Sequence, residues 1–285
     1  MSEATELRAE AAGAAGARDD EGARSGVERI ARAFSAHGRR AALMPYLMGG
    51  YPSLEQSLEI GEACAAAGGD LLEVGVPYSD PLADGPVIHE AGAQAIAAGA
   101  NLGGVLELVR ALAPRLPVVL MCYANMVLAP GAEAFVERLA RTGACGLIVP
   151  DLPLEESEEL RKATDGAGIA LVPLVAPTTP PERFARIAEA ARGFLYAVSV
   201  IGTTGERAAL PSRFDEVVSR AKASTGLPVA LGFGISTAEH ARQAADAGAD
   251  GVIVGTRLVR AAGESEDPAG AVAETLGAIA RGLDP

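Results

Sequence analysis

The sequence predicts a single (β/α)8 barrel with an extra N-terminal helix. Eight short apolar segments with strand character alternate with segments of helical periodicity along most of the 285 residues. The turns from helix to strand repeat one theme, which reads Ala-Gly-Gly-Asp at 67–70, Thr-Gly-Ala-Cys at 142–145 and Ala-Gly-Ala-Asp at 247–250. This count and length suit one closed barrel. An open, doubly wound sheet shows the same alternation and remains an alternative, although no Gly-x-Gly-x-x-Gly motif follows the first strand.

The chain divides into a tail and one catalytic domain. Residues 1–26 consist mostly of alanine, glycine and charged residues, and we expect a disordered N-terminal tail with no part in the chemistry. Residues 27–285 form the barrel domain. The extra helix is expected at 27–36, where Val27, Ile30 and Phe34 recur at helical spacing.

Each expected strand is a short apolar run bounded by glycine, proline or a polar turn. The strands fall at 42–48, 71–76, 117–122, 146–149, 169–175, 193–198, 228–233 and 251–254. Helices begin at capping residues such as Ser53 or at prolines such as Pro181, and they end near glycine or proline. They are expected at 54–67, 87–98, 101–113, 132–141, 155–167, 181–191, 211–224, 237–246 and 269–280.

Charge and composition exclude several classes of protein. The net charge is −13, and no segment is basic enough to indicate nucleic-acid binding. The N-terminus lacks an apolar signal region, and no uninterrupted apolar run reaches about 18 residues, so we expect a cytoplasmic protein without a membrane segment. The cysteines are odd in number and widely spaced, and neither they nor the histidines form a metal-ligand pattern. These residues are Cys64, Cys122, Cys145, His37, His89 and His240.

A lone carboxylate, Glu73, interrupts the apolar strand at 71–76. Such a strand is expected to be buried on both faces, and an ionised glutamate there requires a partner, a raised pKa or a catalytic role. From this segment alone, a core Glu–Arg pair and a general acid/base remain equally plausible. Asp80 and Asp84 follow in the loop after the strand, where turn aspartates are also common.

Three glycine-rich clusters follow the last three strands, at 201–205, 232–236 and 255–256. Each one alone is compatible with an ordinary turn. Together they favour a phosphate site, because glycine lets backbone N–H groups and helix N-termini approach an anion. Tyr46, Met121 and Tyr196 then supply either an aromatic and apolar wall between phosphate and Glu73, or simple packing.

The stretch from Leu72 to Pro86, Leu-Glu-Val-Gly-Val-Pro-Tyr-Ser-Asp-Pro-Leu-Ala-Asp-Gly-Pro, closely resembles the tryptophan synthase alpha subunit family. The segments Tyr-Ala-Asn at 123–125, Tyr-Ala-Val-Ser at 196–199, Thr-Gly at 204–205 and Gly-Phe-Gly-Ile-Ser at 232–236 extend the likeness over about residues 27 to 282. The resemblance implies a barrel lyase of tryptophan biosynthesis. The implied reaction (class EC 4.2.1.20) is the retro-aldol cleavage of indole-3-glycerol phosphate to indole and glyceraldehyde 3-phosphate.

The resemblance also assigns roles to residues. Glu73 would be the acid/base that protonates indole C3 and takes the glycerol hydroxyl proton, and Asp84 would hold the indole N–H and stabilise the positive ring. The loop from 199 to about 210 would be a mobile lid whose Thr204 approaches the catalytic aspartate. The remaining implied positions are Tyr46, Met121 and Tyr196 at the indole, Gly205, Gly234, Gly255 and Thr256 at the phosphate, and Asp80 and Asn125 facing a beta subunit.

A beta partner in an α2β2 complex is therefore implied, with pyridoxal phosphate in that partner and no cofactor or metal in this chain. The two lysines, Lys162 and Lys222, have the spacing of helix-surface residues, so a Schiff-base mechanism is not expected. The protonated indole can itself serve as the electron sink. Tyr46 departs from the family pattern, which more often has phenylalanine there.

Three other functions remain as alternatives. The chain could be a stand-alone indole-releasing lyase, which the sequence hardly distinguishes from an alpha subunit. It could be a non-catalytic subunit that only activates a beta partner, which the presence of Glu73 and Asp84 disfavours. A phosphate-binding epimerase-like barrel would need paired carboxylates with metal-binding histidines, which the sequence lacks.

Overall fold

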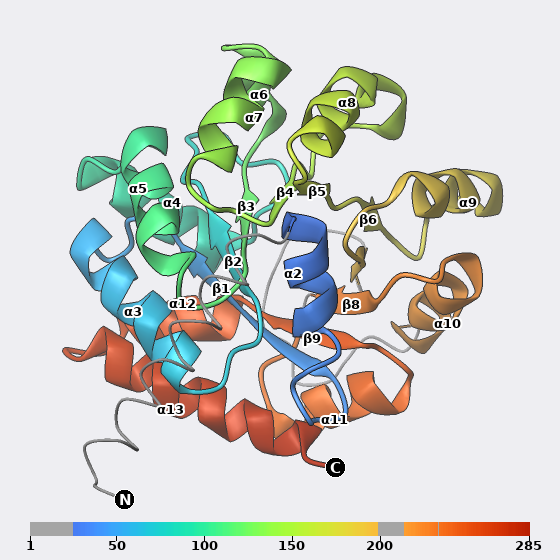
Figure 1. Cartoon of the computed structure of the whole chain (residues 1–285). Helices are drawn as coiled ribbons and strands as arrows, with labels where there is room; N and C mark the ends of the chain where they lie inside the picture. Colours follow the sequence, from blue (N-terminus) through green and yellow to red (C-terminus); the bar gives the residue numbers. More distant parts are fainter. Residues whose placement is uncertain (1–24, 199–213, 233) are drawn as a thin grey trace, which may run out of the picture.

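The computed structural model describes residues 25–198, 214–232 and 234–285. Its strands form one parallel sheet in the order β5-β4-β3-β2-β1-β9-β8-β7-β6, with the helices around the outside (Figure 1). The sequence-predicted strands are all present within one to three residues. They are β1 (Ala42–Met48), β2 (Leu72–Gly75), β3 (Val118–Met121), β4 (Gly146–Ile148), β5 (Ala170–Leu171), β6 (Leu174–Val175), β7 (Leu195–Val198), β8 (Val229–Gly232) and β9 (Gly251–Val254).

The two edges of the sheet are halves of the strand expected at 169–175. β5 pairs with β4, and β6 pairs with β7. Between them, the Val172 N–H donates to the Leu147 carbonyl (2.9 Å), whereas the Pro173 carbonyl accepts from the Tyr196 N–H (3.1 Å). Pro173 has no N–H with which to continue the hydrogen bonds to β4, so the strand changes its partner from β4 to β7 at this point. The sheet thus closes into an eight-unit barrel, and the predicted fold is confirmed against the open sheet.

The helices also follow the sequence pattern, with four differences, one of which is an unexpected 3-10 turn at Arg281–Leu283. The short α6 and α12 were not expected, because each continues closely from a strand end in a segment too short for clear periodicity. The helix expected at 155–167 is divided at Ser157 into a 3-10 turn and an α-helix. The elements are α2 (Gly26–Ala33), α3 (Leu54–Ala66), α4 (Pro86–Ala97), α5 (Leu102–Leu112), α6 (Ala124–Leu128), α7 (Ala132–Ala140), η1 (Leu154–Glu156), α8 (Glu158–Gly166), α9 (Pro181–Ala190), α10 (Phe214–Ser224), α11 (Ala238–Asp246), α12 (Thr256–Gly263), α13 (Pro268–Ala280) and η2 (Arg281–Leu283).

The core has two layers, because alternate strand residues point into the barrel or out toward the helices. The outer layer joins strand residues such as Leu72 and Val74 to helix residues such as Val109 and Leu112. A separate cluster fills the barrel interior, with Met44, Val119, Ile148, Tyr196, Ala230 and Ile253 among its members.

The expected extra helix, α2, covers the N-terminal end of the barrel. Ser25 and Glu28 form a capping box at its start. Ile30 is fully buried within the interior cluster, and Phe34 packs on Phe194 with ring centroids 5.4 Å apart. Figure 1 shows α2 lying across the centre of the strand ring. Because α2 fills this end, a ligand site is left to the C-terminal end of the strands.

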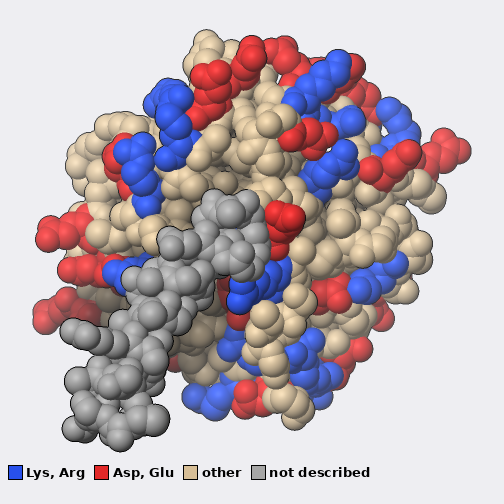
Figure 2. Space-filling model, viewed as in Figure 1, with Lys and Arg blue, Asp and Glu red and all other residues tan. Residues whose placement is uncertain are grey.

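On the surface face shown in Figure 2, acidic and basic side chains are interspersed. Among the described residues, no single helix is long and apolar enough to cross a membrane, and α4 and α5 meet the criterion only jointly, across a 105° bend.

Candidate functional site

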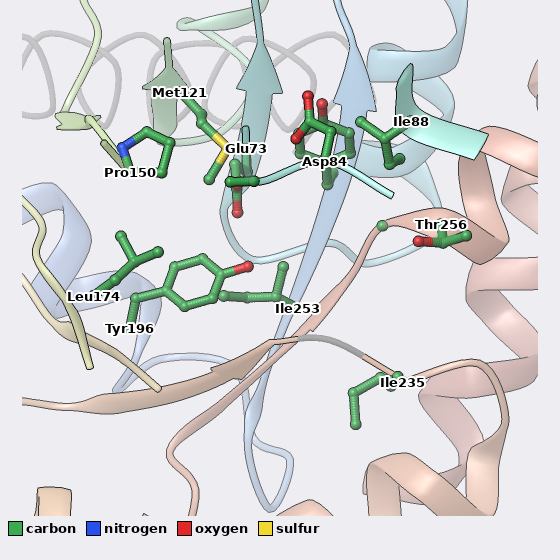
Figure 3. Close-up of a pocket in the computed structure, with 14 residues that line it drawn as sticks. Glu73, Asp84, Ile88, Met121, Pro150, Leu174, Tyr196, Ile235, Ile253 and Thr256 are labelled. Atoms are coloured by element: carbon green, nitrogen blue, oxygen red, sulfur yellow. The ribbon is translucent and has the colours of Figure 1, made fainter. Parts of the chain in front are cut away.

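A cavity opens at the C-terminal end of the barrel (Figure 3). It encloses about 640 Å³ of empty space, part of it open to solvent. Its walls are mostly apolar, with two carboxylates and a helix N-terminus. The lining residues are Tyr46, Glu73, Ala83, Asp84, Ile88, Met121, Pro150, Leu174, Tyr196, Gly234, Ile235, Ile253, Gly255 and Thr256.

Glu73 lies on β2 with only 1% of its surface exposed, and it pairs in register with Tyr46 of β1 and Val119 of β3. Its Oε2 atom has no hydrogen-bond partner, and no arginine forms an ion pair with it among the residues that the structure describes. The part of the chain that the structure describes therefore gives no support to a core Glu–Arg pair. Burial, followed by the negative charge of Asp84, raises the pKa of Glu73 to about 8. The carboxyl group thus carries a proton near neutral pH and can donate it.

Asp84 reaches the same cavity from the loop after β2 (Figure 3). Burial raises the pKa of Asp84, while a hydrogen bond from the Tyr123 hydroxyl and the charge of His89 oppose this rise. The Tyr123 hydroxyl also accepts the Ala83 N–H at 3.1 Å. Two carboxylates with unequal surroundings therefore share one site, which is the arrangement that separates acid and base roles.

Tyr46, Met121 and Tyr196 line the cavity, as the sequence predicted for its wall. The two tyrosine rings fit because the neighbouring strands carry glycine. A Cβ atom on Gly75 would lie 2.8 Å from Cζ of Tyr46, and one on Gly232 would lie 2.7 Å from Cζ of Tyr196, both too close for real contacts. The strand glycines therefore have a steric reason that the sequence alone does not reveal.

The opposite wall carries the candidate phosphate positions. Gly234 has φ +90°, a conformation that favours glycine. Gly255 is the N-cap of α12 and Thr256 its first residue, so the positive end of this helix borders the cavity. The predicted phosphate position Gly205 and the predicted lid residue Thr204 lie outside the described residues, together with the rest of 199–213.

Other predicted positions lie away from the cavity lining. Asp80 and Asn125 are exposed, and two exposed apolar side chains, Leu82 (80%) and Leu128 (54%), lie on the same two segments. Lys162 and Lys222 form surface ion pairs with Glu158 and Asp250, as expected for helix-surface lysines. The three cysteines are buried thiols, and no metal-binding group of His, Cys, Asp and Glu occurs within the described ranges.

Several lining residues were not identified from the sequence. Leu174 and Ile253 lie near strand ends, and strand alternation relative to Met44 or Tyr196 could have indicated them. Ala83 and Ile88 come from the loop and helix after β2, whose path follows no such alternation. The contact of Tyr123 with Asp84 joins segments 39 residues apart and had no signal in the sequence.

Comparisons with known proteins agree with this geometry. The sequence model of the family "Tryptophan synthase alpha chain" matches residues 33–284. The tryptophan synthase alpha chain of Gloeobacter violaceus is 49% identical over 252 residues, which cover 86% of this chain and 91% of that protein. That of a Synechococcus species is 52% identical over 223 residues, covering 78% and 83% respectively.

Solved structures give the same result. A structure of Mycobacterium tuberculosis tryptophan synthase matches with a TM-score of 0.84 and 39% identity, over 90% of this chain and 98% of that one. A structure of the tryptophan synthase a2b2 complex from Pyrococcus furiosus matches with a TM-score of 0.79 and 34% identity, over 84% and 97%.

The geometry alone defines a class, that of (β/α)8-barrel enzymes with acid–base chemistry at the C-terminal end of the strands. The match over most of the sequence then makes the assignment specific. The chain belongs to the tryptophan synthase alpha chain family.

Proposed function

We propose that this chain is a lyase of tryptophan biosynthesis that cleaves indole-3-glycerol phosphate into indole and glyceraldehyde 3-phosphate, with Glu73 and Asp84 as its catalytic residues. Family membership supports the reaction. The observation that supports the roles is the buried Glu73, which carries a proton near neutral pH and faces the same cavity as Asp84.

In the first step, the Glu73 carboxyl group donates its proton to C3 of the indole. The ring becomes a cation, with its charge shared by the indole nitrogen. The Asp84 carboxylate accepts the indole N–H and stabilises this charge, the kind of electrostatic effect that often dominates catalysis.

In the second step, the Glu73 carboxylate takes the proton of the glycerol hydroxyl next to the ring. The carbon–carbon bond to C3 breaks, its electron pair returns to the indole, and the hydroxyl carbon becomes the aldehyde. Glu73 ends the cycle with the proton that it started with. The ring is the electron sink, so the step requires neither a Schiff base nor a metal ion.

The cavity suits this substrate in outline. Tyr46, Met121 and Tyr196 would enclose the indole ring. The backbone at Gly234, Gly255 and the N-terminus of α12 at Thr256 would hold the phosphate at the other end. Thr204 and Gly205 would complete the site from the segment outside the described residues, which we propose acts as a lid.

We further propose an α2β2 complex with a beta subunit that carries pyridoxal phosphate, to which this chain passes its indole. Exposed Asp80 and Asn125, beside Leu82 and Leu128, support a partner surface at the mouth of the barrel. The three buried thiols support a reducing, cytoplasmic setting. The tail expected at residues 1–26 overlaps α2, which begins at Gly26 with Ser25 as its N-cap, so a tail outside the barrel would be limited to residues 1–24.

Indole release from indole-3-glycerol phosphate tests the proposal, measured on the purified chain with and without a beta subunit. We expect slow release alone and much faster release with the partner. Glu73→Gln should lower kcat at least about 10³-fold, a loss typical of removing an essential acid, while Glu107→Gln on the exposed face of α5 should not. Fast release by the chain alone would indicate the stand-alone lyase. Full activity of Glu73→Gln would refute the mechanism.

A further inference from the structure

We propose that Tyr123 is a positioning residue for Asp84, whose hydroxyl fixes the loop from Tyr78 to Asp84 against the mouth of the barrel. This inference rests on the catalytic role proposed for Asp84. It assigns a function to a buried tyrosine that does not itself line the cavity.

Tyr123 contacts both ends of this loop. Its hydroxyl accepts the Ala83 N–H at 3.1 Å and donates to the Asp84 carboxylate. Its ring packs on Tyr78, with centroids 5.1 Å apart and planes inclined at 34°. The ring therefore holds the start of the loop, and the hydroxyl holds its end.

Tyr123 is itself held firmly by the barrel. It is 4% exposed and precedes α6 directly after β3. The Ala124 N–H donates to the Asp151 carboxylate at 2.8 Å, and the Tyr123 carbonyl accepts the Met126 N–H at 3.0 Å. A chain of contacts thus leads from the end of β4, through the start of α6, to the Asp84 carboxylate.

The loop needs such support because much of it faces solvent. Asp80 is exposed, and Leu82 is 80% exposed. A carboxylate on a freely moving loop would not keep a fixed direction toward an indole N–H, and small displacements of this kind reduce rates strongly. The Tyr123 hydroxyl accepts from the Ala83 N–H and donates to the Asp84 carboxylate, so these two neighbouring residues keep a fixed relation to β3.

The hydroxyl also favours the ionised form of Asp84. Burial raises the pKa of Asp84, and the hydrogen bond from Tyr123 is the largest effect that lowers it again. Loss of the hydroxyl would therefore raise the pKa of Asp84. At mildly acidic pH, a larger fraction of the enzyme would then have a protonated Asp84, which lacks the negative charge that stabilises the indole cation.

Tyr123→Phe in the complete chain, assayed with its beta subunit, tests this role. It keeps the ring contact with Tyr78 and removes only the hydroxyl. We expect kcat to fall about 10–100-fold with a smaller change in KM, as for the loss of a group that orients a catalytic residue. The acidic limb of the pH profile of kcat/KM should move to higher pH, which a merely structural tyrosine would not cause. The matched control is Tyr51→Phe. Tyr51 lies outside the cavity lining, so this variant should leave kcat and the acidic limb of the pH profile unchanged.

Asp84→Asn separates this inference from the proposed function. If Asp84→Asn keeps full activity, the role of Asp84 fails and the proposed mechanism with it. If Asp84→Asn is impaired while Tyr123→Phe retains the kcat and acidic limb of the unmodified chain, the role of Tyr123 alone fails. In the double variant, Tyr123→Phe should cost little beyond Asp84→Asn, because Tyr123 acts through Asp84. Fully additive losses would overturn the inference even if Tyr123→Phe were less stable.

Discussion

Asp84 and Glu73 face one cavity, and after burial itself, the negative charge of Asp84 is the main reason that the pKa of Glu73 is raised. Their surroundings differ in kind. Glu73 has an unpartnered carboxyl oxygen in the barrel interior, whereas Asp84 receives a hydrogen bond from Tyr123 and the influence of His89. The pKa of both groups is raised by burial, but only at Asp84 do a hydrogen bond and a nearby histidine oppose the rise, so Glu73 is the group that holds a proton at neutral pH. That division is what the cleavage of a protonated indole requires.

Lyase activity should accordingly fall as pH rises through about 8. The protonated form of Glu73 is the acid of the first step, and its pKa of about 8 means that this form is lost above that value. The profile of kcat/KM between pH 5 and 10 measures this directly, with circular dichroism as a check that the fold persists. Because the two carboxylates interact, the apparent pKa values from this profile belong to the pair and not to one residue. A profile that stays level up to pH 10 would contradict the proposed acid.

Glu73→Gln should stabilise the fold at alkaline pH while it abolishes activity. Above about pH 4.5 the unfolded chain ionises Glu73, but the folded chain keeps it protonated up to about 8, so stability declines through this window. Glutamine does not ionise, so the stability of the variant does not decline for this reason. At pH 8 the gain in unfolding free energy should be roughly 3–5 kcal/mol, and near pH 4 it should vanish. Thermal unfolding of both proteins at pH 4 and pH 8 measures this gain. The same gain at both pH values would contradict the link between the raised pKa of Glu73 and stability.

Gly75→Ala should damage the indole end of the cavity through Tyr46. The added Cβ would lie 2.8 Å from Cζ of Tyr46 and closer still to its hydroxyl, so the ring must move. We expect KM to rise several-fold and stability to fall by about 1–3 kcal/mol, the usual cost of overpacking. Tyr46→Phe removes the nearest atom and should partly restore KM in the double variant. Gly99→Ala is unsuitable as a control because of its φ of +92°, whereas Gly277→Ala, with open space in a helix, is suitable.

The sequence predicted the features of this molecule that depend on local pattern. Glu73 was identifiable because one charge stands in an apolar strand, and α2 because its apolar residues recur at helical spacing. The change of strand partner at Pro173, the fit of Tyr46 over Gly75 and the bond from Tyr123 to Asp84 were not predictable. Each of these depends on atoms from segments distant in the chain, which meet only after the barrel closes.

Asn125→Arg should weaken activation by the beta subunit without changing the basal rate. Asn125 is exposed on α6, outside the cavity lining, and its segment also carries exposed Leu128. A bulky charge at a partner surface removes complementarity, and a cost of about 1–3 kcal/mol would weaken binding about 5–150-fold. Titration of lyase activity with beta subunit measures the change. Gln94→Arg on the exposed side of α4 is the control, and equal effects of both variants would place the partner elsewhere.

Ile30→Ala should destabilise the barrel and leave its chemistry intact. Ile30 of α2 is fully buried in the interior cluster at the N-terminal end, whereas the cavity opens at the opposite end. Truncation there should cost about 2–5 kcal/mol of unfolding free energy, because the helix cannot collapse fully into the space left behind. Below the unfolding transition, kcat and KM should stay within about twofold of the unmodified chain, since the folded site is unchanged. Arg32→Ala, on the exposed side of the same helix, should alter neither property. If folded Ile30→Ala loses kcat at 25 °C, the packing of α2 at the N-terminal end of the barrel would instead affect catalysis at the opposite end.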